Sequence, residues 1–368
     1  MDTSPAEFCY VPAFRILAEG KDITAALQQR LTGLILTDNG GTTARSDELK
    51  ITLLSETLKL PPKGARLRVA LGFNRELTDK GWYVVCGVAS SGPPRSLTLY
   101  ATAAPMNAAR QPGDVLSQKT RSWEDMTVES LVRTVAASHG LIPRVAQSLA
   151  SKRTGHIDQI AESDANLLSR IASRMNAVSK PSGGYWLFLG QGAALTASGK
   201  KRATAVLTPD LVSRWTYSEG ERGSTRATGE KNAGPPGSIG VRYYDEADGR
   251  TRTATADHEG PPSQYPYTQP ASSQALQKVA RGKMQAARNA RKMSLSGPCT
   301  PELLALTAES RVQTRGFGER EDTDWLTESL IFSLTPAGLS YSINLVKDTA
   351  ATKVSPKKQQ NNGPDYFG

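Results

Sequence analysis

The sequence predicts an α+β protein that is mainly β, with two barrel-like β domains and a small helical insert between them. Three observations predict this class. Short alternating apolar runs fill the N-terminal part, the apolar spacing becomes helical in the middle, and strand-like runs return afterwards. Alternation indicates strands, whereas apolar residues three and four positions apart indicate an amphipathic helix. With 38% hydrophobic residues, the 368-residue chain can bury more than one core.

The first β domain is expected over residues 1–107. Its predicted strands are short, and turn-forming glycine and proline residues separate them. These strands are Phe14–Leu17, Leu49–Leu53, Leu67–Leu71, Trp82–Cys86 and Leu97–Tyr100. Several short strands at this spacing are typical of a small barrel or sandwich. Asp47, Glu48 and the nearby Arg45 are interpreted as solvated turn residues.

The helical insert is expected over residues 108–180, beginning with a polar connector over 108–122. Thr127 is a candidate N-cap for a first helix, which Gly140 is well placed to end. The apolar face of this helix would hold Val128, Leu131, Val132, Val135 and Ala136. Ser163 is a candidate cap for a second helix, with Leu167, Leu168, Ile171, Ala172 and Met175 on one face.

The second β domain is expected over residues 181–348. Its first strand would be Tyr185–Leu189, and Asp248-Gly249 is a turn pair typical of a hairpin. The hairpin strands would be Val241–Tyr244 and Arg250–Thr253, and Trp325–Leu334 and Leu339–Val346 would close the domain.

A long helix, residues 273–292, is expected as an insertion in this second domain. Residues 219–237 and 259–273 are rich in Gly, Pro, Ser, Thr and charge, which predicts exposed loops. Residues 349–368 are expected to form a disordered tail because they are rich in Lys, Gln, Asn, Pro and Gly.

The formal net charge of +10 is compatible with binding to nucleic acid, a membrane surface or an acidic partner. The densest basic cluster lies in the 273–292 helix, opposite its Leu, Val and Ala residues. That pattern is typical of a helix packed on a sheet with a charged outer face. Nucleic acid is therefore not the expected ligand, and an acidic protein surface remains open as a partner.

The three cysteines, Cys9, Cys86 and Cys299, are far apart and form no C-x-x-C pair. This spacing disfavours disulfide frameworks and zinc clusters, and predicts reduced thiols in a cytoplasmic folding environment. No run of 18 apolar residues predicts a membrane anchor. The first ten residues do not show the charged-then-apolar pattern of a secretory signal.

The three histidines, His139, His156 and His258, are isolated, and each is expected to be structural or solvated. His139 ends the first predicted helix, where a cation suits the helix dipole. Asp322 and Asp324 could form a carboxylate pair, but adjacent loop carboxylates before a strand are usually solvated.

Two motif-like stretches also fail as sites. Asp245-Glu246-Ala247-Asp248 resembles a helicase sequence but lies in the predicted hairpin turn. Residues 190–201 have the wrong spacing for a phosphate loop and end in lysine, so no hydroxyl would be placed on magnesium. The sequence therefore assigns no catalytic, cofactor-binding or metal residue, and we do not expect an enzyme.

Residues 123–141 resemble the first helix of a LysM peptidoglycan-binding module, although the second half of that consensus is missing. A peptidoglycan-binding protein that acts through this helix is therefore kept as an alternative function.

The order of elements resembles the late control D proteins of contractile-tailed phages, the baseplate hub family. The stretches that carry the resemblance are residues 12–24, the helix that ends in His139-Gly140, residues 162–172, the helix over 275–291, and residues 324–345. The resemblance covers about residues 10–348 and leaves the loop at 219–237 and the C-terminal tail unaccounted for.

This resemblance implies a structural protein of the virion tail baseplate, assembled in the host cytoplasm. Three chains would form a homotrimeric ring with pseudo-sixfold symmetry, because each chain would supply two related barrels. The ring would adapt a sixfold tail tube to a threefold spike. The implied partners are tail spike protein, tail tube protein and tape-measure protein. Some related hubs carry a fused lysozyme domain, but both β regions are needed for the barrels here.

Overall fold

The computed structural model describes residues 10–40, 46–59, 61–104, 115–175, 177–192, 202–220, 238–245, 250–257, 263–265 and 291–347. The chain divides into two compact units. The larger unit comprises Met1–Thr216 and Met293–Leu345, and the smaller comprises Tyr217–Lys292 and Val346–Gly368. The described residues are mostly strands with few helices, which confirms the α+β, mainly β class.

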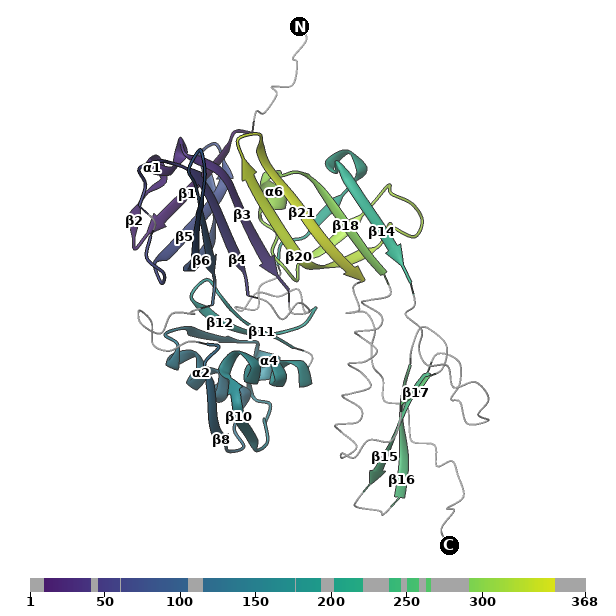
Figure 1. Ribbon diagram of the computed structural model, residues 1–368. Helices are drawn as coiled ribbons and strands as arrows, with labels where there is room; N and C mark the ends of the chain where they lie inside the picture. The colour runs from purple at the N-terminus through teal and green to yellow at the C-terminus, as the bar shows by residue number, and fades with distance from the viewer. Residues whose placement is uncertain are drawn as a thin grey trace. The chain divides into compact units, whose positions relative to one another are not determined.

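The N-terminal part of the larger unit contains all five predicted strands and two that were not predicted, β2 and β3 (Figure 1). The strands are β1 (Pro12–Ala18), β2 (Lys21–Asp22), β3 (Leu31–Asn39), β4 (Glu48–Leu54), β5 (Arg66–Phe73), β6 (Glu76–Ser91) and β7 (Ser96–Thr102). A short helix, α1 (Thr24–Gln28), follows β2. Alternate side chains of these strands are buried, as in β5, which points Leu67, Val69 and Leu71 inward.

The later part of the chain returns to strands, including both predicted closing strands. These elements are β13 (Ala205–Leu207), β14 (Arg214–Glu219), β18 (Arg291–Pro298), α6 (Pro301–Leu304), β19 (Arg311–Thr314), β20 (Asp324–Thr335) and β21 (Gly338–Lys347). The strands of both regions belong to one 13-stranded sheet. Its order is β14-β18-β21-β20-β3-β4-β7-β6-β5-β1-β2, while β13 pairs with β19, which also pairs with β20.

The two β regions meet where β3 pairs with β20 in antiparallel register. Leu34 lies opposite Leu334, and Leu36 lies opposite Phe332. All four side chains are buried. We call this pairing the internal seam. It connects the two β regions in the middle of the sheet, through both backbone hydrogen bonds and buried apolar side chains (Figure 1).

Strand pairing follows the same order in both regions. In the first, β6 pairs with β5 and β7, and β4 and β3 follow β7. In the later region, β20 pairs with β19 and β21, and β18 and β14 follow β21. The corresponding strands also appear in the same order along the chain. The correspondence stops at β1, which is antiparallel to β5, whereas β13 is parallel to β19.

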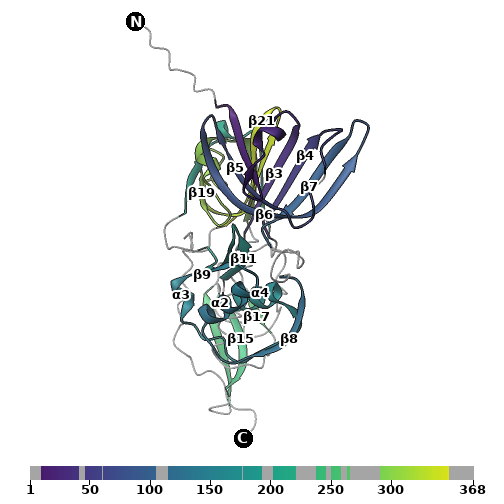
Figure 2. The ribbon, with the colours of Figure 1, turned by 90° about the vertical axis from the view of Figure 1, so that its left-hand side faces the viewer.

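The insert folds as a small α/β layer structure with its own core. Its elements are β8 (Gln118–Trp123), α2 (Val128–Ser138), β9 (Ile142–Val145), α3 (Gln147–Ala150), β10 (Ile157–Ser163), α4 (Asp164–Arg174), β11 (Ala177–Ser182) and β12 (Tyr185–Gly190). Helices α2 and α4 lie between the β8–β10 pair and the β9–β12–β11 sheet (Figures 1 and 2).

Both predicted helices of the insert are confirmed together with their caps. The Thr127 and Ser163 hydroxyls accept hydrogen bonds from the backbone N–H groups of Ser130 and Asn166, each at 3.2 Å. Gly140 follows α2 with a φ of 66°, the left-handed conformation that ends a helix. All predicted apolar residues of the first helix are buried.

Two stretches of the larger unit differ from their predicted roles. The stretch predicted as a connector, 108–122, contains most of β8, which pairs with β10 in antiparallel register from Gln118 to Trp123. The predicted strand Tyr185–Leu189 is β12, and its Trp186 and Phe188 pack in the core of the insert. The predicted domain boundary at residue 180 thus falls within β11, which pairs with β12.

The smaller unit contains the predicted hairpin as β15 (Ser238–Asp245) and β16 (Arg250–Asp257), with Asp245 opposite Arg250. A third strand, β17 (Ser263–Tyr265), lies within the stretch predicted as the loop 259–273. Arg291 and Lys292, expected to end the inserted helix, instead begin β18. The rest of the predicted 273–292 helix, residues 221–237 of the predicted loop and the predicted tail 349–368 lie outside the described residues.

Candidate functional site at the junction of sheet and insert

Lys180 of β11 carries the central charge of a buried cluster between the insert and the sheet. Its Nζ lies 2.9 Å from Oδ1 of Asp38 and 2.7 Å from Oδ1 of Asp47. The ammonium also donates to the backbone carbonyl of Asn39. Two carboxylate oxygens and one carbonyl oxygen thus accept hydrogen bonds from the three N–H groups of the Lys180 ammonium.

Each carboxylate of this cluster is held by further donors. The backbone N–H of Ala308 donates to Asp38 Oδ2 at 2.8 Å. The hydroxyl of Ser182 donates to Asp47 Oδ2 at 2.9 Å, and the Asn39 N–H donates to Asp47 Oδ1 at 3.0 Å. The cluster therefore ties three segments together: the β3–β4 region, the segment before β19, and the insert.

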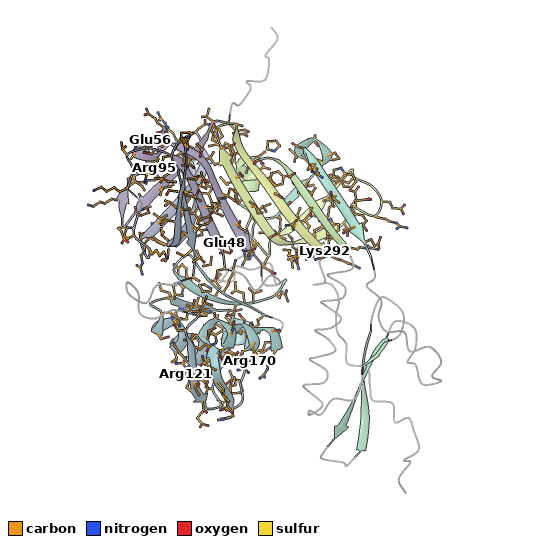
Figure 3. All side chains as sticks on the ribbon, viewed as in Figure 1. Glu48, Glu56, Arg95, Arg121, Arg170 and Lys292 are labelled. Atoms are coloured by element: carbon orange, nitrogen blue, oxygen red, sulfur yellow. The ribbon has the colours of Figure 1, made fainter. Side chains whose placement is uncertain are left out.

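The prediction that Asp47 is a solvated turn residue is wrong, because only 4% of the residue is exposed. Its sequence neighbour Glu48 is exposed, as predicted, at the start of β4 (Figure 3). Arg45 lies outside the described residues. Sequence reasoning missed Asp47 because its partner Lys180 is 133 residues away. The one local signal was an acidic residue directly before a strand.

Burial and the shared lysine pull the pKa values of the cluster in different directions. Burial, reinforced by the charge of Asp38, raises the pKa of Asp47 to about 6 despite Lys180. Burial also acts to raise the pKa of Asp38, but the charge of Lys180 and the Ala308 N–H outweigh it, so that pKa falls. For Lys180, burial is outweighed by the two carboxylates, and its pKa rises. The lysine is therefore charged at neutral pH.

A second lysine, Lys80 of β6, joins the two β regions beside this cluster. Its Nζ donates to the Leu304 carbonyl at 2.6 Å and lies 4.3 Å from the centre of the Phe332 ring. Burial lowers the pKa of Lys80 to about 8. Burial also raises the pKa of the Cys299 thiol to about 12, which leaves it protonated and unreactive at neutral pH.

Within the insert, Asp164 at the start of α4 is the centre of another buried network. Its carboxylate accepts hydrogen bonds from the side chains of Lys119, Arg121, His139 and Gln159 at 2.5–2.9 Å. Both Asp164 and the His139 side chain are fully buried. Burial acts to raise the pKa of Asp164, but the hydrogen bonds and the charge of Arg121 outweigh it and lower that pKa.

His139, expected from the sequence to be structural or solvated, is structural: its Nε2 lies 2.8 Å from Asp164 Oδ2. His156 is exposed, with Nε2 3.3 Å from Asp158 Oδ1, and His258 lies outside the described residues. The carboxylates of Asp322 and Asp324 have separate partners. Asp322 accepts from the N–H groups of residues 316 and 317, and Asp324 accepts from the side chain of residue 313.

The remaining sequence candidates lie partly or wholly outside the described residues, or have exposed or core positions. Asp245 ends β15, and the rest of the helicase-like motif lies outside the described residues, as do residues 193–201 of the phosphate-loop candidate. Cys86 is exposed and Cys9 is not described. In the LysM-like stretch, the apolar face of α2 is buried in the core of the insert.

Across the described residues, no group of three or more His, Cys, Asp or Glu side chains is arranged to hold a metal ion. Within the same residues, no helix is both long and apolar enough to cross a membrane. The buried carboxylates found here bind cationic side chains, so their chemical effect is to fasten segments that are distant in the sequence (Figure 3 labels Arg121 of the Asp164 network).

Two tail proteins are among the solved structures that share this fold. The 43 kDa tail protein of prophage MuSo2 from Shewanella oneidensis has a TM-score of 0.68, with 92% of this chain and 98% of that chain covered at 13% identity. A tail protein from Neisseria meningitidis MC58 has a TM-score of 0.64, with 92% and 97% covered at 14% identity. At these identities the likeness concerns the fold alone.

Sequence comparison gives the family. A protein of Escherichia phage 186 described as "Probable baseplate hub protein" is 35% identical over 214 residues, 58% of this chain. The match spans 54% of that relative, about half its length. The family model described as "Phage tail baseplate hub (GPD)" matches residues 115–336, well over half of the chain. The resemblance found in the sequence is therefore confirmed, and the chain belongs to the phage tail baseplate hub family.

Proposed function

We propose that this chain is the structural hub of the baseplate in a contractile phage tail or a phage-derived particle. Three copies form a ring that adapts the sixfold tail tube to the threefold central spike. One observation supports this most: the two β regions of the chain have the same order of strand pairing. Three chains with two similar units each give six near-equivalent contact units around a threefold axis.

The proposed partners follow from this geometry. The six similar units would face the tail tube, and the true threefold symmetry would match the spike, with the tape-measure protein as a further partner. Assembly would take place in the host cytoplasm. The fastened junction supports such a role, because a ring under mechanical load needs its segments held in fixed positions.

Multi-angle light scattering of the purified protein tests the ring. The expected molar mass is three times the 39.5 kDa of one chain. Co-expression with a candidate spike protein from the same genome should yield a complex of three hub chains and three spike chains. A monomer at every concentration that never co-purifies with spike or tube protein would contradict the proposal.

We also propose that the chain is not an enzyme. The buried carboxylates Asp38, Asp47 and Asp164 are each held by cationic side chains and are therefore not free for acid–base chemistry. Purified protein should therefore leave the turbidity of a cell-wall suspension unchanged, with lysozyme as the positive control. Robust clearing by the wild-type protein would refute this part of the proposal.

A further inference from the structure

Strand β6 is paired on both edges along only part of its length. Val84 lies opposite Arg66 of β5 on one edge and Thr102 of β7 on the other. The β5 edge ends at Val85, whose N–H donates to Ala65. From Cys86 to Ser91, the described part of the chain provides a partner on the β7 edge alone.

The corresponding strand of the later region, β20, has both edges filled. One edge pairs with β21. On the other edge, β19 pairs with residues 324–326, and β3 continues along residues 329–334. The second half of β20 thus receives β3 at the place where the second half of β6 receives no described strand. Exposure agrees with this difference: Leu330 and Phe332 of β20 are buried, whereas Val88 of β6 is half-buried and Ser90 is exposed.

The counterpart of β3 in the later region is β14, because both lie at the far end of the same order of pairing. β3 is covered by β20, but β14 is the terminal strand of the sheet among the described residues. Trp215 of β14 is 42% exposed, with one side of its ring against Phe317 at 5.5 Å. A large aromatic side chain on a terminal strand is suited to packing against a partner.

From this we propose that β14 of one copy pairs with Cys86–Ser91 of β6 in the next copy, repeating the internal seam between chains. The inference rests on the proposed ring and identifies its contact. Each chain uses β14 on one side and β6 on the other, so the contact is head-to-tail and generates a ring when it closes. Addition of a strand to an open sheet edge supplies the backbone hydrogen bonds that such an edge lacks.

The internal seam also indicates the register in which β14 and β6 would pair between chains. In β20, Glu328 and Ser329 are half-buried, and full burial resumes at Leu330. In β6, the pairing register with β7 shifts between Val85 and Gly87, at the corresponding place along the strand. Val88 and Ser90 thus correspond to Leu330 and Phe332.

On β3, which pairs with β20 in the internal seam, Leu36 lies opposite Leu49, the first buried residue of β4. Glu219 contacts Arg291, two residues before Met293, the first buried residue of β18. We take this ion pair to place Glu219 opposite Arg291 in the pairing of β14 with β18, which makes Tyr217 the counterpart of Leu36. The Leu36–Phe332 pair becomes Tyr217–Ser90 between chains, and its neighbour becomes Ser218–Ala89.

Disulfide trapping tests this pairing. The variant carries Ser218→Cys and Ala89→Cys, with Cys86→Ser to remove the exposed native thiol near the seam. Oxidised protein should run on a denaturing gel as a covalent trimer with no larger species, and reductant should return it to single chains. Each variant with only one of the two introduced cysteines, and a control pair of Ser218→Cys with Ser340→Cys on β21, should give no covalent trimer.

Light scattering on the same reduced samples separates the outcomes. A trimeric mass without cross-links from Ser218→Cys/Ala89→Cys would overturn this pairing and leave the ring intact. A monomeric mass without cross-links would overturn both. A covalent ladder beyond the trimer would support the pairing and contradict closure at three copies.

A second measurement uses the wild-type thiol. Cys86 is exposed in the single chain and would be covered in the seam. Alkylation of Cys86 should be at least about tenfold slower in wild-type protein than in an Ala89→Lys variant, which places a charge in the seam. Circular dichroism should show that Ala89→Lys remains folded. Equal alkylation rates in a trimeric wild type and a monomeric Ala89→Lys variant would count against the pairing.

Discussion

Replacing Lys180 with methionine removes the only cation that directly contacts Asp38 and Asp47 among the described residues. Methionine retains the apolar length of the side chain, so the change chiefly removes charge. Two buried carboxylates would then share a small volume with no cation in direct contact, and only the more distant charge of Arg202 would still act on Asp38. We expect the variant to lose stability at neutral pH and the insert to detach from the sheet before the rest of the chain unfolds.

The magnitude follows from the geometry. At separations of 2.9 and 2.7 Å, each ion pair is worth about 6 kcal/mol in Coulomb energy at an effective dielectric constant of about 20. Desolvation of the three buried ions offsets most of this, so the intact cluster contributes little net stability. Removing one partner leaves that desolvation uncompensated, and the expected loss is about 3–5 kcal/mol in the free energy of unfolding.

Urea denaturation followed by tryptophan fluorescence measures this loss. A triple variant, Asp38→Asn, Asp47→Asn and Lys180→Met, is the matched control and should recover most of the stability, because none of the three charges of the cluster remains. The deficit of Lys180→Met should also shrink in acid, as both carboxylates become protonated. A Lys180→Met protein within about 1 kcal/mol of wild type at pH 7 would refute the reasoning.

Three further predictions concern single residues. Asp164→Asn leaves the cations and the buried His139 without their carboxylate and should cost about 2–4 kcal/mol in urea denaturation, whereas Asp158→Asn at an exposed site should cost under about 0.5 kcal/mol. The pKa of Asp47 is raised to about 6 from an ordinary 3.8, so its folded form binds the proton more tightly and its contribution to stability falls as pH rises between those values. The stability of wild type relative to Asp47→Asn should therefore fall by about 3 kcal/mol between pH 3.5 and 7, and a difference that does not change with pH would contradict this. Thr127→Ala removes the cap of α2 and should cost about 1 kcal/mol, measured as a shift in the thermal midpoint against Thr134→Ala within the same helix.

Local patterns in the sequence predicted the elements whose physical causes are local. Thr127 and Ser163 were recognised as caps because the hydroxyl and the N–H it binds are three residues apart. Strands β4, β5 and β7 are predicted from short apolar or alternating runs separated by glycine and proline residues. By contrast, β3 has Gly33 inside it and Asp38-Asn39 at its end, residues that commonly punctuate strands. Its strand conformation is stabilised by β4 and by β20 from the far end of the chain.

The junction could not be predicted because its causes are long-range. An aspartate before a strand is usually solvated, and Asp47 is buried here because Lys180 and Ser182 approach it from the insert. His139 was placed correctly at the end of α2, but its contact with Asp164 depends on the packing of two helices. The order of strand pairing shared by the two β regions appears only once the partners of each strand are known.

The central claim is that each chain contributes two similar units to a threefold ring. Electron microscopy of the purified protein, averaged in projection down the ring axis without imposed symmetry, tests this most directly. We expect a ring of six similar lobes around a central opening, formed by three chains. A ring with three lobes, or particles with no ring at a concentration where light scattering gives three chains, would contradict it.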